Sequence, residues 1–132
     1  MKTKKIVIRT ERGWAGHFIC ANQCRFRRNT LLQYNGVEIV VSTIGLMENR
    51  LKGKGVGFEK NFSEIGCDRY YETMAFYTDP TDTRYHDADI AKEVHFDSEW
   101  SISIIDADDK ANEMHEAAVE ELTNKLLSKQ IV

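Results

Sequence analysis

The sequence of 132 residues contains little of several residue types and patterns that define common protein classes. It has one proline and three cysteines, and an odd number of cysteines argues against a disulfide framework and for a reducing compartment. The apolar runs are short pieces such as IVVSTIGLM, far below the roughly 20 residues that cross a bilayer. The lysines of MKTKKIVIRT are not followed by the apolar core or cleavage site of a secretory signal. These absences predict a cytoplasmic protein that does not enter a membrane.

Patterns typical of enzymes and cofactor-binding proteins are missing as well. His115 and Glu116 do not belong to an H-E-x-x-H zinc motif, because position 119 is valine. The glycines of GKGVGF are spaced by two, unlike those of a phosphate-binding Walker loop or a dinucleotide fingerprint. No Ser-His-Asp or Cys-His set is apparent from spacing, although such groups are often distant in sequence. We therefore expect no cofactor and favour binding over catalysis.

Charge is distributed unevenly along the chain. Residues 1–60 carry twelve Lys and Arg against four Asp and Glu, a balance of +8, and residues 61–132 carry a balance of −11, which together give the net charge of −3. This asymmetry indicates either an anionic partner for the first half or pairing between the halves after folding. The length and the hydrophobic content of 42% are those of a single globular domain over residues 1–132.

The clearest structural signal is a β-hairpin. The segments RFRRNTLLQY and VEIVVSTI flank Asn35-Gly36, the pair that best suits a type I′ turn because both turn positions need a positive φ. A two-residue loop places Leu32 opposite Ile39, on the same strand face as Phe26 and Arg28. The paired residues match in character, which cross-strand contacts favour.

The remaining segments predict shorter strands and one helix. Strand-like patterns occupy residues 4–9, 16–20, 69–78, 88–96 and 99–105, and the glycine-rich residues 50–66 are expected to form a loop. Residues 106–129 have a helical apolar stripe, with Asp106 as the expected N-cap. The stripe consists of Ala107, Ala111, Met114, Ala118, Leu122 and Leu126. The prediction is α+β, with a mostly antiparallel sheet of five to seven strands and a C-terminal amphipathic helix packed on it.

Two groups of residues offer metal ligands, although neither has a common spacing. The first group is His17, Cys20, Cys24 and Cys67. Its H-x2-C-x3-C spacing is not that of a common zinc knuckle, so we expect buried, reduced and metal-free thiols. The second group is His86, Asp87, Asp89 and His95. Mixed His and Asp ligands suit a divalent metal, but alternating acids after a turn are usually solvated. A metal protein or small enzyme built on either group is the alternative interpretation.

Arginines of the predicted hairpin offer a binding surface. Arg25, Arg27 and Asn29 share one strand face, and Lys52 and Lys54 of the glycine-rich loop are candidates for its edge. Arginine suits phosphate because its planar fork donates two parallel hydrogen bonds.

Arg28 and Trp14 each leave two interpretations open. Arg28 points to the opposite strand face, where it needs a carboxylate or an anionic ligand, and Glu72 is the partner we expect. Trp14, between Gly13 and Gly16, is either a core aromatic or a stacking surface for a base.

Three segments together resemble a known family. The runs ERGWAGHFICANQCRFRRNTLLQYNGVEIVVSTIG, RYYETMAFYT and DADDKANEMHEAAVEELTNKLL are similar to a family of small uncharacterised proteins encoded by phages and prophages. The resemblance covers nearly the whole chain and implies an accessory protein in the cytoplasm of a bacterial host cell, acting in anti-defence or in phage takeover. Together with the arginine cluster, it leads us to expect a binding protein whose partner is a nucleic acid, a nucleotide or a host protein.

Overall fold

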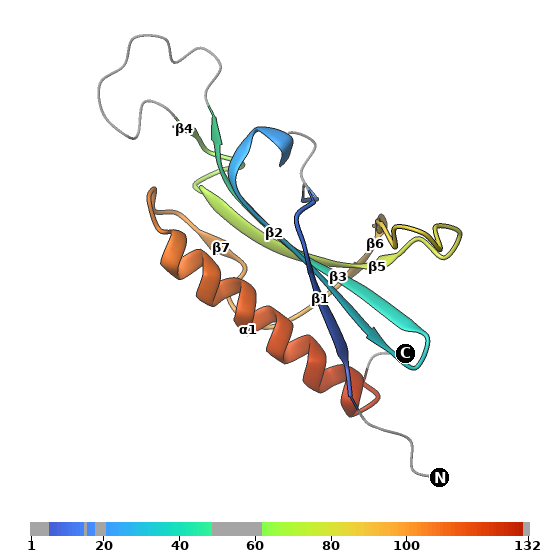
Figure 1. Ribbon diagram of the computed structural model, residues 1–132. Coiled ribbons are helices and arrows are strands. Elements are labelled where there is room, and N and C mark those ends of the chain that lie inside the picture. Colours follow the sequence, from blue (N-terminus) through green and yellow to red (C-terminus); the bar gives the residue numbers. More distant parts are fainter. Residues whose placement is uncertain (1–5, 15, 18–20, 49–61, 131–132) are drawn as a thin grey trace.

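The computed structural model describes residues 6–14, 16–17, 21–48 and 62–130 of the chain. Within these residues it contains an antiparallel sheet of seven strands and one long helix (Figure 1). The elements in chain order are β1 (Ile8–Arg12), the 3-10 helix η1 (Ala21–Gln23), β2 (Cys24–Tyr34), β3 (Val37–Glu48), β4 (Phe62–Ser63), β5 (Tyr71–Thr78), β6 (Ala88–Val94), β7 (Ser101–Ile102) and α1 (Asp108–Leu127). The strand order is β1-β2-β3-β5-β6, while β4 pairs with the end of β3 and β7 with the start of β5. This architecture confirms the predicted α+β class.

The predicted hairpin forms the centre of the sheet. Asn35 and Gly36 have φ values of 49° and 82°, as a two-residue type I′ turn requires. Leu32 pairs with Ile39, and the predicted register continues without a bulge to Arg27 opposite Ile44. The hairpin and its register are therefore confirmed.

Helix α1 lies along one face of the sheet (Figure 1). All six residues of the predicted apolar stripe are buried, and His115 and Val119 are buried beside them. The contacts between helix and sheet form two apolar clusters. One cluster includes Leu32, Ile39, Val41, Ala75, Ala118 and Leu122, and the other includes Phe26, Leu46, Tyr71, Ile102, Ala111 and Met114. Among the described residues, no helix combines the length and the apolar composition needed to cross a membrane.

The start of α1 differs from the sequence prediction. The N-cap residue is Ala107, which has no side chain to bond the helix N–H groups, so the expected cap at Asp106 is wrong. Asp106 adopts a φ of 60°, and the chain turns before the helix begins. The hydroxyl of Tyr71, on β5, accepts a hydrogen bond from the Ala107 N–H at 2.8 Å and donates one to Asp108 Oδ1 at 2.7 Å. A residue from the sheet thus replaces the local cap.

We expect the substitution Tyr71→Phe to lower the free energy of unfolding by about 1–2 kcal/mol, because it leaves the buried Ala107 N–H without an acceptor. Burial and the hydrogen bond to Asp108 raise the pKa of Tyr71, so the hydroxyl stays protonated and remains a hydrogen-bond donor at neutral pH. Urea denaturation of both proteins measures the difference. A loss below about 0.3 kcal/mol would show that the helix start does not depend on this hydroxyl.

Several shorter elements have different boundaries from those predicted. The strand expected at residues 4–9 runs from Ile8 to Arg12, where it pairs with the second half of β2. Gly16 and His17 are not in a strand, and residues 18–20 lie outside the described residues. Strand β7 has only two residues, because the outer edge of β5 is shared between β6 and β7. Most of the expected loop at residues 50–66 also lies outside the described residues.

Candidate anion-binding face

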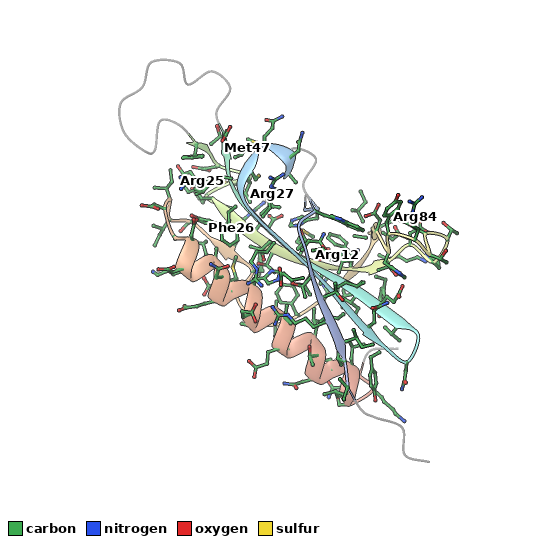
Figure 2. The ribbon with its side chains drawn as sticks, in the orientation of Figure 1. Arg12, Arg25, Phe26, Arg27, Met47 and Arg84 are labelled. Carbon is green, nitrogen blue, oxygen red and sulfur yellow. The ribbon has the colours of Figure 1, made fainter. Side chains whose placement is uncertain are left out.

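The face of the sheet opposite α1 carries Arg27, one of the two hairpin arginines that were predicted to bind a partner. Side chains alternate along the regular part of a strand, so Arg27 points away from Phe26, which packs against α1. Arg25 and Arg27 are both exposed, and Figure 2 shows them beside Met47, near β4. Arg27 forms no ion pair with any carboxylate of the described residues. Lys52 and Lys54, expected at the edge of this surface, lie outside the described residues.

The next residue on this face, Asn29, is only 5% exposed, which corrects its expected place on the binding surface. Its Oδ1 accepts a hydrogen bond from Arg12 Nε at 2.9 Å. Arg12 Nη1 also donates to the carbonyl oxygens of Tyr85 at 2.6 Å and His86 at 3.3 Å. The buried Nη2 has no hydrogen-bond partner, and burial lowers the pKa of this guanidinium. Arg12 is therefore a cation held by neutral acceptors, and no carboxylate of the described residues bonds it.

Trp14 is half-buried against this arginine. The Arg12 guanidinium carbon lies 3.8 Å from the centre of the Trp14 ring, a cation–π contact. The Trp14 and Tyr85 rings meet edge to face, with centroids 6.0 Å apart and an interplanar angle of 65°. Together with Asp87 they line an open pocket of about 290 Å³. Trp14 thus belongs neither to the apolar core nor to a freely displayed loop, and one side of its ring system borders a pocket.

Arg28 does not contact Glu72, so the ion pair predicted from sequence is wrong. Arg28 pairs across the sheet with Thr43, whereas Glu72 pairs with Ile44, and the two side chains therefore lie on opposite faces. Arg28 Nη2 instead lies 2.7 Å from Glu11 Oε1 and 2.9 Å from Glu116 Oε2. These two carboxylates, from β1 and α1, satisfy the guanidinium and leave it unsuited to an external anion.

Glu11, one of the two carboxylates that bind Arg28, belongs to a hydrogen-bond network that extends beneath α1. Glu11 accepts a hydrogen bond from the Thr30 hydroxyl at 2.9 Å. Thr30 Oγ1 lies 2.7 Å from His115 Nε2, and Thr43 Oγ1 lies 2.7 Å from His115 Nδ1. Because a carboxylate only accepts, Thr30 donates to Glu11 and accepts from the Nε2–H, which leaves Nδ1 as the acceptor for Thr43. His115 is thus held in one neutral tautomer.

Burial of His115 has a strong effect on its protonation. The side chain is 0% exposed, and this burial lowers the pKa of His115 to about 4, with the nearby Arg28 charge acting in the same direction. The imidazole is therefore neutral at pH 7 and inaccessible to any substrate. No local pattern in the sequence indicates a structural role for His115, because its hydrogen-bond partners are 72 and 85 positions away in the chain.

On the face of the sheet opposite α1, Ser42, His17 and Glu72 form a serine–histidine–glutamate set. The spacing of these three residues in the sequence does not indicate such a set. His17 Nδ1 lies 2.9 Å from Ser42 Oγ, and His17 Nε2 lies 2.9 Å from Glu72 Oε1. Ser42 also accepts a hydrogen bond from the His17 backbone N–H and is 1% exposed. A nucleophilic serine must be reached by its substrate, and this one is buried in the middle of β3.

The hydrogen bonds of His17 to Ser42 and Glu72 therefore attach the segment before β2 to the sheet. A side chain at Gly16 would overlap Ile44 and Ser42, so glycine allows the close approach. Burial has the largest single effect and raises the pKa of Glu72, but the interactions with His17, with smaller contributions from Arg69, together keep this pKa below its ordinary value. The geometry supports a structural role for His17.

The metal-ligand candidates that lie within the described residues are not brought together. His17 bonds Ser42 and Glu72, Cys24 is buried as expected, and Cys20 lies outside the described residues. Cys67 is exposed in a turn, which corrects the expectation of a buried thiol. Among the described residues, no group of three or more His, Cys, Asp or Glu side chains is placed to hold a metal ion.

The second ligand candidate set is also dispersed. His86 and His95 lie at opposite ends of β6. His86 Nδ1 contacts Glu38 at 2.9 Å, whereas the His95 side chain is 89% exposed.

Comparison of the chain with known protein families, with curated proteins and with solved structures finds no match.

Proposed function

We propose that this chain is a non-enzymatic binding protein, which takes an anionic partner on the face of the sheet opposite α1. The observation that carries this proposal is the exposure of Arg27, two residues from the exposed Arg25, on a face without an ion-pair partner for Arg27 among the described residues. Guanidinium groups in such positions favour phosphate or carboxylate groups of a partner. In the phage setting that the sequence resemblance implies, the partner is a nucleic acid, nucleotide or host protein of the bacterial cytoplasm, and the role is anti-defence or takeover.

The distribution of charge around the fold supports this choice of face. Helix α1 carries six acidic and two basic residues, and Glu113 and Glu120 are exposed on its outer side. A negatively charged partner is repelled from this helix and attracted to the opposite side of the sheet, where Arg27 lies. The arginines of the helix side are in contrast neutralised, since Arg9 and Arg28 both bond carboxylates.

A charge-reversal experiment tests the proposed face. We expect the protein to bind immobilised heparin, a sulfated polyanion, despite its net charge of −3, and the double substitution Arg25→Glu with Arg27→Glu to abolish most of this retention. Each lost arginine contact releases roughly one counterion fewer on binding, so the slope of log affinity against log salt concentration should become shallower by about one. The measurement is the salt concentration at elution, at two pH values where the fold is intact.

A matched control separates the position of the charge from its amount. Lys110→Glu with Lys129→Glu changes the net charge equally, but both lysines are exposed at the two ends of α1. This control should elute close to the unmodified protein. Equal losses for the two pairs, or a wild-type protein that heparin does not retain, would mean that the face has no specific affinity for anions and that the proposal is wrong.

A further inference from the structure

We propose that the pocket lined by Trp14, Tyr85 and Asp87 binds a guanine base of a single-stranded nucleic acid. This inference rests on the proposed function, because the phosphates of the same strand would contact Arg27. It goes further by naming the partner, the base and the residues that recognise it.

The two aromatic rings provide the walls of the pocket. At an interplanar angle of 65°, a flat base that stacks on one ring meets the other ring with its edge. Tyr85 is 47% exposed, so a base can reach it without a rearrangement of the core. Each ring already carries a guanidinium, Arg12 at 3.8 Å from the Trp14 centre and Arg84 at 4.9 Å from the Tyr85 centre. Stacking of bases on aromatic side chains with nearby arginines is the usual means of holding a single strand.

The third lining residue gives the pocket a preference among bases. A carboxylate is only an acceptor, and the exposed Asp87 side chain bonds no donor of the described residues. Guanine presents two adjacent N–H donors on its Watson–Crick edge, which match the two oxygens of a carboxylate. Adenine and cytosine each offer only one amino group there. Single-stranded nucleic acids are commonly read along this edge once a base is unstacked.

The position of the pocket relative to the arginines suits one strand. Arg12, under Trp14, bonds Asn29, and Arg27 lies two residues from Asn29 on the same face of β2. At about 3.4 Å per residue this separation is roughly 7 Å along the strand. The carboxylates of Asp87 and Asp82 act on Arg12 and oppose a phosphate in the pocket itself. The geometry therefore assigns the neutral base to the pocket and the phosphate to Arg27.

Tryptophan fluorescence gives a direct readout. The chain has two tryptophans, so Trp100→Phe leaves Trp14 as the sole reporter. The probes are single-stranded oligouridylates of seven nucleotides with one central guanine, hypoxanthine, adenine or cytosine. We expect the guanine probe to quench Trp14 most strongly and to bind roughly ten-fold more tightly than the adenine probe, because a matched two-donor contact discriminates by about that factor. Hypoxanthine, which lacks the amino group, should bind with intermediate affinity.

Two variants and one control separate the base pocket from the basic face. Asp87→Asn should bring guanine and adenine affinities within about two-fold of each other, and Trp14→Ala, measured by anisotropy of a labelled probe, should weaken all probes at least five-fold. Trp100→Ala is the matched control, since Trp100 is the second tryptophan of the chain, is 47% exposed and lies beside an arginine, Arg69. It should leave affinity unchanged.

The outcomes distinguish this inference from the proposed function. If the probes bind in an Arg27-dependent manner while Asp87→Asn and Trp14→Ala bind like the unmodified protein, the guanine pocket is wrong and the anionic face stands. Retention on heparin without binding of any probe also refutes the guanine pocket and points to a protein partner. Because Asp87 is exposed and its replacement is nearly isosteric, a failure of Trp14→Ala to fold would still leave the specificity test intact.

Discussion

Replacing His115 with leucine is expected to lower the free energy of unfolding by about 2–3 kcal/mol, although the substitution exchanges a polar residue for an apolar one in the core. The imidazole makes two hydrogen bonds of 2.7 Å, to Thr30 and Thr43, at a site that is 0% exposed. Each lost buried hydrogen bond costs about 1–1.5 kcal/mol. The two hydroxyls keep one partner each, Glu11 and Thr73, which prevents a larger loss. Chemical denaturation at pH 7.5 measures the difference.

A double-mutant cycle shows whether the hydrogen bonds cause this loss. Thr43→Val combined with His115→Leu should destabilise the protein by less than the sum of the single substitutions, because both remove the same contact. His95→Leu is the matched control, since the His95 side chain is 89% exposed and its replacement should change stability by less than about 0.5 kcal/mol. Strict additivity of the cycle would contradict the proposed network.

Local signals predicted a large part of this fold. The Asn35-Gly36 turn sets its own register, because two consecutive positive φ values allow only a tight hairpin. The three- and four-residue spacing from Ala111 to Leu126 likewise specifies which side of α1 is buried. In both cases the residues concerned lie close together along the chain, so a short sequence pattern can predict the structure that they form.

Contacts between distant segments were not accessible in the same way. The partner of Arg28 depends on β1 lying beside β2 and on α1 covering that face, and neither arrangement follows from the residues around Arg28. The N-cap shows the same limit, because the acceptor for Ala107 comes from Tyr71, in a different element. His115 lies next to the apolar stripe of α1, and the sequence alone is consistent with a solvent-exposed polar side chain there. Its burial depends on two threonines of the sheet, Thr30 and Thr43, which are distant in the sequence.

The candidate site was predicted only in part for the same reason. Arg25 and Arg27 could be identified from strand alternation, and the structure places both at the surface. The pocket beside them combines Trp14 with Tyr85 and Asp87, which are more than 70 residues away in the sequence. Arg12 connects the two segments through backbone carbonyls, and no sequence motif encodes such a contact. The fold, rather than any run of residues, assembles the site.

The stability of the protein should fall as the pH decreases from about 6.5 to 4. The pKa of His115 is about 6.5 in an unfolded chain and about 4 in the folded protein, chiefly because burial disfavours the charged imidazole. Between these values the unfolded state binds a proton that the folded state does not, so protonation favours unfolding. The contribution of neutral His115 is present above pH 6.5 and is lost by pH 4, a difference of about 3 kcal/mol at 1.36 kcal/mol for each pKa unit.

Urea denaturation from pH 8 to pH 3 measures this dependence, with His115→Leu as the reference. The variant starts less stable but should lose much less stability between pH 6.5 and 4, so the two curves converge or cross within this range. Both proteins should then weaken together at lower pH, because hydrogen bonding from Arg9 lowers the pKa of Glu116 to about 2 and that ion pair is lost as the carboxylate is protonated. This second loss is reduced by solvent screening, since the Glu116 side chain is 47% exposed. Parallel curves between pH 6.5 and 4 would show that His115 does not titrate as a buried neutral residue, and would place the origin of acid sensitivity in other groups.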